Sequence, residues 1–158
     1  RALCDYQAKE NSVRDISHLL SAKPAEVAEA VKRLQGENQQ WKEKLTRMQN
    51  HYLEKKLEEI SQDTEQYILF EQEMDKNAAR RFVDAGMRRC GKLCGIFLGT
   101  DENGYQYTFG SQTLELKVFL KDFHEKFSGK GGGKGEMVQG TVSGSEAELR
   151  AYLMEILH

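Results

Sequence analysis

The sequence predicts an α+β chain, with a long N-terminal helical hairpin or coiled coil followed by a small domain built on a mixed sheet. Two observations predict it. Apolar side chains in the first 62 residues recur at 3-, 4- and 7-residue spacing, which is typical of amphipathic helices. From residue 65 onward, short apolar or alternating runs are interleaved with helical patterns, which indicates a sheet covered by helices. We therefore divide the chain into residues 1–62 and 65–158.

Pro24, the only proline, separates two expected helices. The first is an amphipathic helix of about five turns that ends near Leu20. The second runs from about Pro24 to the low sixties and carries a heptad seam, whose members are Val31, Leu34, Asn38, Trp41, Leu45, Met48 and Tyr52. The seam then slips by one residue and continues as Leu53, Leu57 and Ile60.

The two helices differ in length, so a hairpin leaves about half of the second helix uncovered. We expect a second copy of the chain to pack on the seam and form a homodimer, with the polar Asn38 fixing the register. The alternative is that Asn38 faces water and the seam packs within its own chain. The pattern alone does not separate these two interpretations.

The second half is expected to run in the order βαββαβα. Strands are predicted at 67–70, 93–98, 105–109 and 137–142, and helices follow Asp75, at 113–128 and after Ser145. Ser145 and Glu148 have the spacing of a capping box. The aromatic residues that alternate between Tyr105 and Phe109 can stack on bases, but burial between sheet and helix explains the alternation by itself, and we favour it.

Six of the chain's 14 glycines fall in the segment 129–140, where Lys130 and Lys134 flank three of them. Glycine loses much backbone freedom on ordering, so such a dense cluster needs a reason. We expect a loop whose bare N–H groups and lysines hold phosphate, and the alternative is a flexible linker. Between Lys117 and Lys134, five lysines and two acidic residues give a local charge of +3.

The composition excludes several classes of function. With 158 residues and a net charge of -2, the chain is not basic overall, so binding to nucleic acid requires a local patch. No apolar run reaches the length of a membrane span, no signal peptide is visible, and we expect a cytoplasmic protein. The chain does not begin with Met, and we expect it to be a fragment.

The sequence also lacks the side-chain spacings of a reaction centre. Cys90 and Cys94 lack the two further ligands that a zinc site needs, so we interpret them as core thiols. The four histidines are isolated, and no catalytic or metal-ligating residue is proposed. We therefore expect binding rather than hydrolysis.

The segment 129–140 resembles the signature of the DHHA1 domain family, the C-terminal domain of alanyl-tRNA synthetases and of long-form alanyl-tRNA editing proteins. The residues that match are Gly131, Gly132, Gly133, Lys134, Glu136, Met137, Gln139 and Gly140. Gly135 stands where the family usually has proline, and Val138 where it usually has alanine. The run 77–80 (Asn-Ala-Ala-Arg) and the preceding helices also resemble this family.

The resemblance implies a module that binds the elbow of alanine-specific tRNA, dimerises through its helical part and leaves catalysis to upstream domains. The chain would then be no enzyme by itself and need no cofactor, whereas zinc is expected in the missing editing domain. We expect the nucleic-acid contacts at Lys126, Lys130, Gly131, Gly132, Gly133, Lys134 and Gln139. The alternatives are a purely structural oligomerisation domain or the substrate-gripping domain of a DHH-type phosphoesterase.

Overall fold

The computed structural model describes residues 2–61 and 63–157, and the chain divides into two units. The helical unit is Arg1–Arg47 and the α/β unit is Met48–His158. The predicted α+β class is confirmed, because N-terminal helices precede a five-stranded mixed sheet. The division between the two units lies inside a helix, and the boundary that we expected near residues 62–65 stays a prediction.

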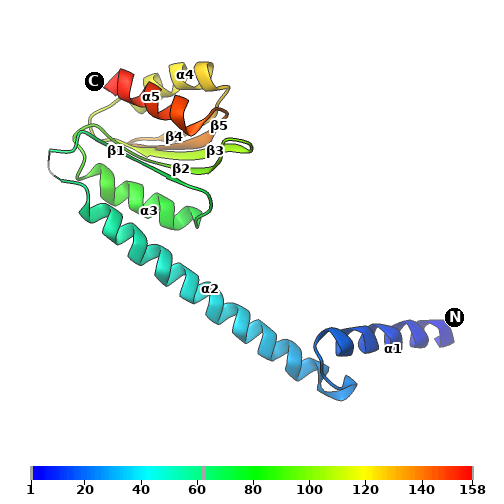
Figure 1. The fold of residues 1–158 in the computed structure, drawn as a ribbon. Helices are drawn as coiled ribbons and strands as arrows, with labels where there is room; N and C mark the ends of the chain where they lie inside the picture. Colours follow the sequence, from blue (N-terminus) through cyan, green and yellow to red (C-terminus); the bar gives the residue numbers. More distant parts are fainter. Residues whose placement is uncertain (1, 62, 158) are drawn as a thin grey trace. The chain divides into compact units, whose positions relative to one another are not determined.

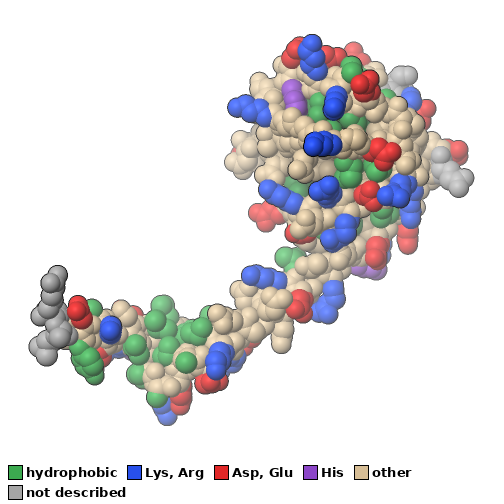
Figure 2. Space-filling view, turned by 180° about the vertical axis from the view of Figure 1, so that it is seen from behind, with side chains coloured by type: hydrophobic (Ala, Val, Ile, Leu, Met, Phe, Trp, Pro, Cys, Tyr) green, Lys and Arg blue, Asp and Glu red, His purple; other side chains and the backbone are tan. Residues whose placement is uncertain are grey.

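The helical unit consists of α1 (Ala2–Leu19), a 3-10 turn η1 (Pro24–Glu26) and the first part of α2 (Val27–Glu58). Its apolar side chains are largely exposed, and Ala30 is the one buried hydrophobic residue in the described stretch 5–47. Leu19 is 85% exposed and Trp41 66% exposed. Figure 2 shows hydrophobic side chains on the surface of this unit. The apolar faces that a packed hairpin would cover are therefore open.

The sheet of the α/β unit has the order β1-β2-β3-β5-β4. Its strands are β1 (Gln66–Glu71), β2 (Leu93–Thr100), β3 (Gly104–Gly110), β4 (Lys130–Lys134) and β5 (Met137–Val142). β1 and β2 are parallel, and every other pair is antiparallel. β1 and β4 therefore form the two edges of the sheet.

Helices cover the two faces of the sheet unequally (Figure 1). α4 (Leu116–Phe127) and α5 (Glu146–Leu157) lie on one face, over an aromatic core that includes Phe97, Tyr107 and Phe123. The other face packs against α3 (Lys76–Met87) and the last turns of α2, where Leu53 is buried. The part of the seam beyond Tyr52 thus packs on its own domain.

Local sequence signals fix the ends of the helices as expected. The carboxylate of Asp75 accepts a hydrogen bond from the N–H of Ala78 at 2.8 Å and caps α3. The hydroxyl of Ser145 accepts from the N–H of Glu148, and the Glu148 carboxylate accepts from the N–H of Ser145, which completes the predicted capping box.

The glycine segment differs from its prediction. Residues 130–134 form an edge strand, not a loop, so the order of elements is βαββαββα. Lys134 pairs with Met137 across a two-residue turn of Gly135 and Glu136. The backbone of Gly135 has a φ of +71°, the left-handed conformation that such hairpin turns require. The glycine that stands where the family usually has proline therefore serves a tight turn.

Candidate nucleic-acid interface

Three glycines at the β4 edge are required by the close approach of β4 to β5. A Cβ on Gly140 would lie 2.2 Å from the carbonyl oxygen of Lys130, and one on Gly133 would lie 2.2 Å from that of Met137. A Cβ on Gly131 would lie 2.4 Å from the carbonyl oxygen of Gln139. Side-chain carbons do not occur this close to backbone oxygens, so packing within the sheet explains these three glycines.

Gly132 has no such explanation. A Cβ at this position would meet nothing within 4 Å, and its φ is one that ordinary residues adopt. Glycine in a strand costs stability through its backbone entropy, so an unforced glycine points to a role outside the fold. A backbone without a side chain lets a ligand approach closely.

Gly132 lines a shallow hollow of about 170 Å³ on the α3 face of the sheet, called here the β4 hollow. The hollow is bounded by one residue of α3, one of β3 and the hairpin of β4 and β5, namely Arg80, Thr108, Gly132, Gly133, Lys134, Met137, Val138 and Gln139. Because β4 is an edge strand, alternate N–H groups point away from β5. The hollow thus offers cations, an amide side chain, a hydroxyl and bare backbone.

Arg80, Lys130 and Lys134 supply the positive charge at the hollow. Lys130 alternates with Gly132 and Lys134 along β4, so it shares their face of the sheet. All three cations are exposed, and none forms an ion pair with any residue that the structure describes. Figure 2 shows Lys and Arg side chains spread over one face of the α/β unit. Cations without protein partners are free to pair with phosphate.

The comparison with protein families agrees with this architecture. The family model of the DHHA1 domain matches residues 54–157, about two thirds of the chain. The chain belongs to the DHHA1 domain family. No curated protein matches the sequence.

Among solved structures, the DHHA1 chain matches RecJ of Thermus thermophilus, crystallised in complex with Mg2+. The two sequences are 16% identical and the TM-score is 0.49. The match covers 91% of this chain and 27% of the RecJ chain. The chain thus spans about a quarter of the length of that relative.

The DHHA1 fold brings together most of the predicted contact residues and separates one of them. Lys134, Gln139, Gly132 and Gly133 line the β4 hollow, with Gly131 and Lys130 on the same strand. Lys126 lies on α4, and its ammonium stands 4.5 Å from the centre of the Tyr152 ring of α5. It therefore belongs to the opposite face of the sheet and does not join the hollow.

Sequence reasoning missed Arg80 as a contact residue. Arg80 occupies an exposed position on α3, between residues that face the core, and lies about fifty positions before the glycines. Nearby on α3, the carboxylate of Asp84 is held by Arg88 at 3.2 Å, so it does not neutralise Arg80. The available signal was the run 77–80 (Asn-Ala-Ala-Arg), but only the folded sheet brings its arginine to the hollow.

A buried pair supports the DHHA1 domain's glycine strand from beneath. The Tyr107 hydroxyl is hydrogen-bonded to Nε2 of His124 at 2.7 Å. A Cβ on Gly131 or Gly140 would lie 2.7 or 2.6 Å from that hydroxyl. Burial lowers the pKa of His124 and raises that of Tyr107 to about 12, so both groups are held neutral.

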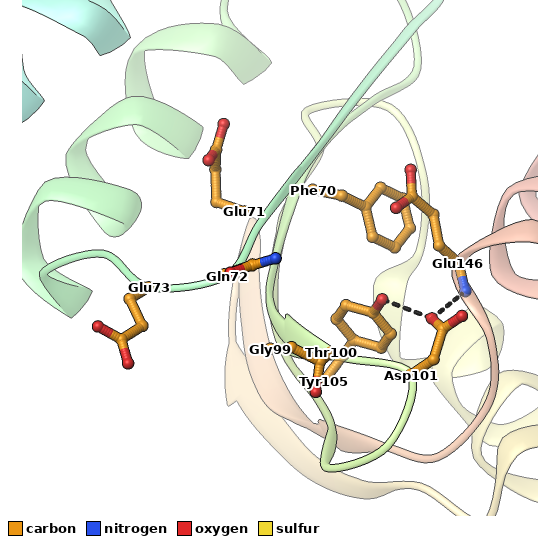
Figure 3. A pocket seen from close by; sticks show the side chains of 9 residues that line it. All are labelled: Phe70, Glu71, Gln72, Glu73, Gly99, Thr100, Asp101, Tyr105 and Glu146. Carbon is orange, nitrogen blue, oxygen red and sulfur yellow. Dashed lines mark hydrogen bonds between the residues drawn. The ribbon is translucent and has the colours of Figure 1, made fainter.

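A second, larger hollow of about 730 Å³ has the wrong charge for phosphate. Glu71, Glu73, Asp101 and Glu146 line it at the far end of the sheet (Figure 3). Asp101 accepts hydrogen bonds from the Tyr105 hydroxyl at 2.7 Å and from the N–H of Glu146 at 2.9 Å. These bonds lower the pKa of Asp101, so its carboxylate is charged and occupied within the fold.

The described residues do not assemble a metal centre. No group of three or more His, Cys, Asp or Glu side chains among them lies close enough to hold a metal ion. None of the described helices combines the length and the apolar character that a membrane crossing requires.

The seam residues on α2 lie mostly at the surface. Leu34, Trp41, Leu45 and Met48 are between 52% and 66% exposed, Asn38 is exposed and Val31 is half-buried. Tyr52, at 37% exposed, donates a hydrogen bond from its hydroxyl to the carboxylate of Glu71 in its own chain. Burial, together with this bond, raises the pKa of Tyr52 to about 12.

Proposed function

We propose that this DHHA1 domain binds nucleic acid, with phosphates lying along the β4 hollow and the glycine strand. One observation carries the proposal: Gly132 is not required by the fold, yet it is bare and lies in a hollow lined by Arg80 and Lys134. Cations and backbone N–H groups without protein partners are the groups that hold phosphate oxygens. The contacts are to the backbone of the nucleic acid, so they position it without reading its sequence.

The ligand that the family resemblance favours is the elbow of alanine-specific tRNA, in the cytoplasm. Phosphate contacts from an exposed sheet suit a folded RNA that is recognised by its shape. The alternative is a substrate strand held for a DHH-type phosphoesterase. Competition separates the two, because tRNA should displace a labelled tRNA probe at lower concentration than single-stranded DNA of equal length. The reverse order would favour the phosphoesterase.

In this proposal the chain is a binding module and is no enzyme by itself. The arrangement at the β4 hollow contains cations and amides but no carboxylate placed to activate water among the residues that line it. Chemistry would belong to other domains of a larger protein, an editing hydrolase or an alanine-tRNA ligase. We propose no cofactor for these residues, and zinc stays an expectation for the editing domain.

The test removes the two strand lysines together. Lys130→Ala/Lys134→Ala should weaken binding and reduce the slope of log K against log salt by about 1.4, from two contacts at about 0.7 each for a single strand. The matched control is Lys117→Ala/Lys121→Ala, which removes the same charge from exposed positions of α4 on the other face. Equal losses in both variants would show a non-specific charge effect and refute the site. Lys126→Ala tests the separated lysine alone.

We propose homodimerisation as a second function, supported by the exposed seam of α2. Four large apolar side chains on one face of a surface helix are costly in water and typical of an interface. Trp41→Glu should convert a dimer into a monomer in sedimentation, whereas Gln40→Glu on the adjacent position should leave it intact. A monomeric unmutated chain would contradict the proposal, and a dimer that ignores tRNA would favour a purely structural module.

A further inference from the structure

Two thiols meet at the end of α3, in a part of the α/β unit that the proposed interface does not use. Cys94 lies in β2 and is 0% exposed, in the core beneath α3. Cys90 follows α3 in the turn toward β2 and is half-buried at the edge of the same core. Both thiols are free, and their side chains are joined by a hydrogen bond.

The two thiols have unequal surroundings. The hydrogen bond from Cys94 lowers the pKa of Cys90, whereas the same bond and burial raise the pKa of Cys94. Cys90 is thus the sulfur that carries negative charge and that solvent reaches, and Cys94 is the protonated thiol behind it. An accessible thiolate next to a second thiol is the arrangement of oxidisable pairs.

A structural or metal role explains the pair less well. No group of three or more ligating side chains lies here among the described residues, so the thiols do not form part of a metal centre. A small apolar side chain would fill the site of Cys94 equally well, but packing alone does not require a second, half-exposed thiol in contact with it.

We propose that Cys90 and Cys94 are a modification site at which a hydroperoxide forms an intramolecular disulfide. The inference is independent of the nucleic-acid interface, because neither thiol lines the β4 hollow.

The chemistry balances with hydrogen peroxide as the oxidant. The Cys90 thiolate attacks one peroxide oxygen, the O–O bond breaks, and the released hydroxide takes a proton to become water. The sulfur of Cys90 is oxidised by two electrons to a sulfenic acid. The sulfur of Cys94 then attacks it, the S–O bond breaks, and the hydroxyl leaves with the Cys94 proton as a second water. A thiol reductant reverses the product.

The test is a tryptic map of the full chain carrying Cys4→Ser, after treatment with hydrogen peroxide. Trypsin cuts after Arg89, Lys92 and Lys117, so the disulfide would join peptide 90–92 to peptide 93–117. We expect this linked pair, with a mass two hydrogens below the sum of its parts, and its loss after reduction. The readout needs no change at the buried position, so it does not depend on a variant that fails to fold.

Two variants test the assigned order of events. In Cys94→Ser, and in Cys94→Ala as a second version, the sulfenic acid at Cys90 has no partner and should be trapped by dimedone. In the chain that keeps both thiols, dimedone labelling should be lost. Cys90→Ser should give neither product. Absence of the linked peptides, or equal dimedone labelling with and without Cys94, would overturn the proposal.

Discussion

Gly132 and Gly140 are the pair of positions at which strand packing and ligand binding separate most cleanly. Alanine at Gly140 places its Cβ 2.2 Å from the Lys130 carbonyl oxygen, whereas ordinary contact begins at 3.4 Å. The strands must therefore part by about 1.2 Å, the difference of these two values, which exceeds the tolerance of a ladder hydrogen bond. We expect Gly140→Ala to lower the free energy of unfolding by about 1–3 kcal/mol.

Gly132→Ala should behave in the opposite way. Its Cβ meets nothing within 4 Å, so the fold tolerates it, and the reduced freedom of the unfolded chain should raise the free energy of unfolding by about 0.4–1 kcal/mol. The added methyl group enters the β4 hollow, however, and keeps a phosphate away from the strand backbone. We expect binding to weaken about tenfold, equivalent to losing one hydrogen bond to a charged group at about 1.5 kcal/mol.

Urea unfolding followed by circular dichroism measures the first effect, and fluorescence anisotropy with labelled tRNA measures the second. The two variants add the same methyl group to neighbouring strands, so each controls for the other. If Gly132→Ala binds as tightly as the unmutated chain, bare backbone at this position has no role in binding. If Gly140→Ala is as stable as the unmutated chain, the close approach of β4 to β5 is wrong.

Three further perturbations test the cap, the buried pair and the missed arginine. Asp75→Ala removes the side-chain acceptor of α3 and should cost about 1 kcal/mol in urea unfolding, whereas Asp75→Asn should retain most of it. His124 has a lowered pKa in the fold, so the unfolded chain binds its proton first; stability should fall as the pH drops below about 6.5, and His124→Gln should flatten that part of the curve. Arg80→Ala should weaken nucleic-acid binding and its salt slope by about one contact at about 0.7, while Arg47→Ala should change neither; equal effects of the two would remove Arg80 from the interface.

The elements of the α/β unit were predictable where the signal is local. The alternation from Tyr105 to Phe109 matches a strand with one buried face, because successive side chains point to opposite sides. The Asp75 cap and the box of Ser145 and Glu148 depend on residues three positions apart, and both hydrogen-bond as expected. Signals of this kind need no knowledge of the rest of the fold.

The glycine strand was not predictable from propensity, because glycine is depleted in strands. Residues 130–134 are extended because β5 offers a ladder next to them and because Gly135 turns the chain back onto it. The turn itself carried a signal, a glycine at the first position of a two-residue loop, that the predicted loop obscured. Pairing between segments overrides the preference of a single residue.

The composition of the β4 hollow was only partly predictable for a similar reason. Lys134 and Gln139 lie within the glycine segment and were expected, but Arg80 comes from a different helix. Lys126 and Lys130 are neighbours in sequence and lie on different faces, because the chain passes from α4 over the edge of the sheet into β4. A count of charge along the sequence cannot separate residues that the fold sends to opposite sides.

The two faces of the sheet depend on each other through Tyr107. Its ring is packed in the aromatic core under α4, against Phe109 and Phe123, and its hydroxyl reaches His124 beside the glycine strand. Only glycine at positions 131 and 140 leaves room for that hydroxyl. The packed core therefore sets the height at which β4 sits, and with it the position of Gly132 and Lys134 on the open side. Since a well-packed core yields little to small forces, a ligand at the hollow meets a backbone already held in place, and less of its binding energy goes into ordering the strand.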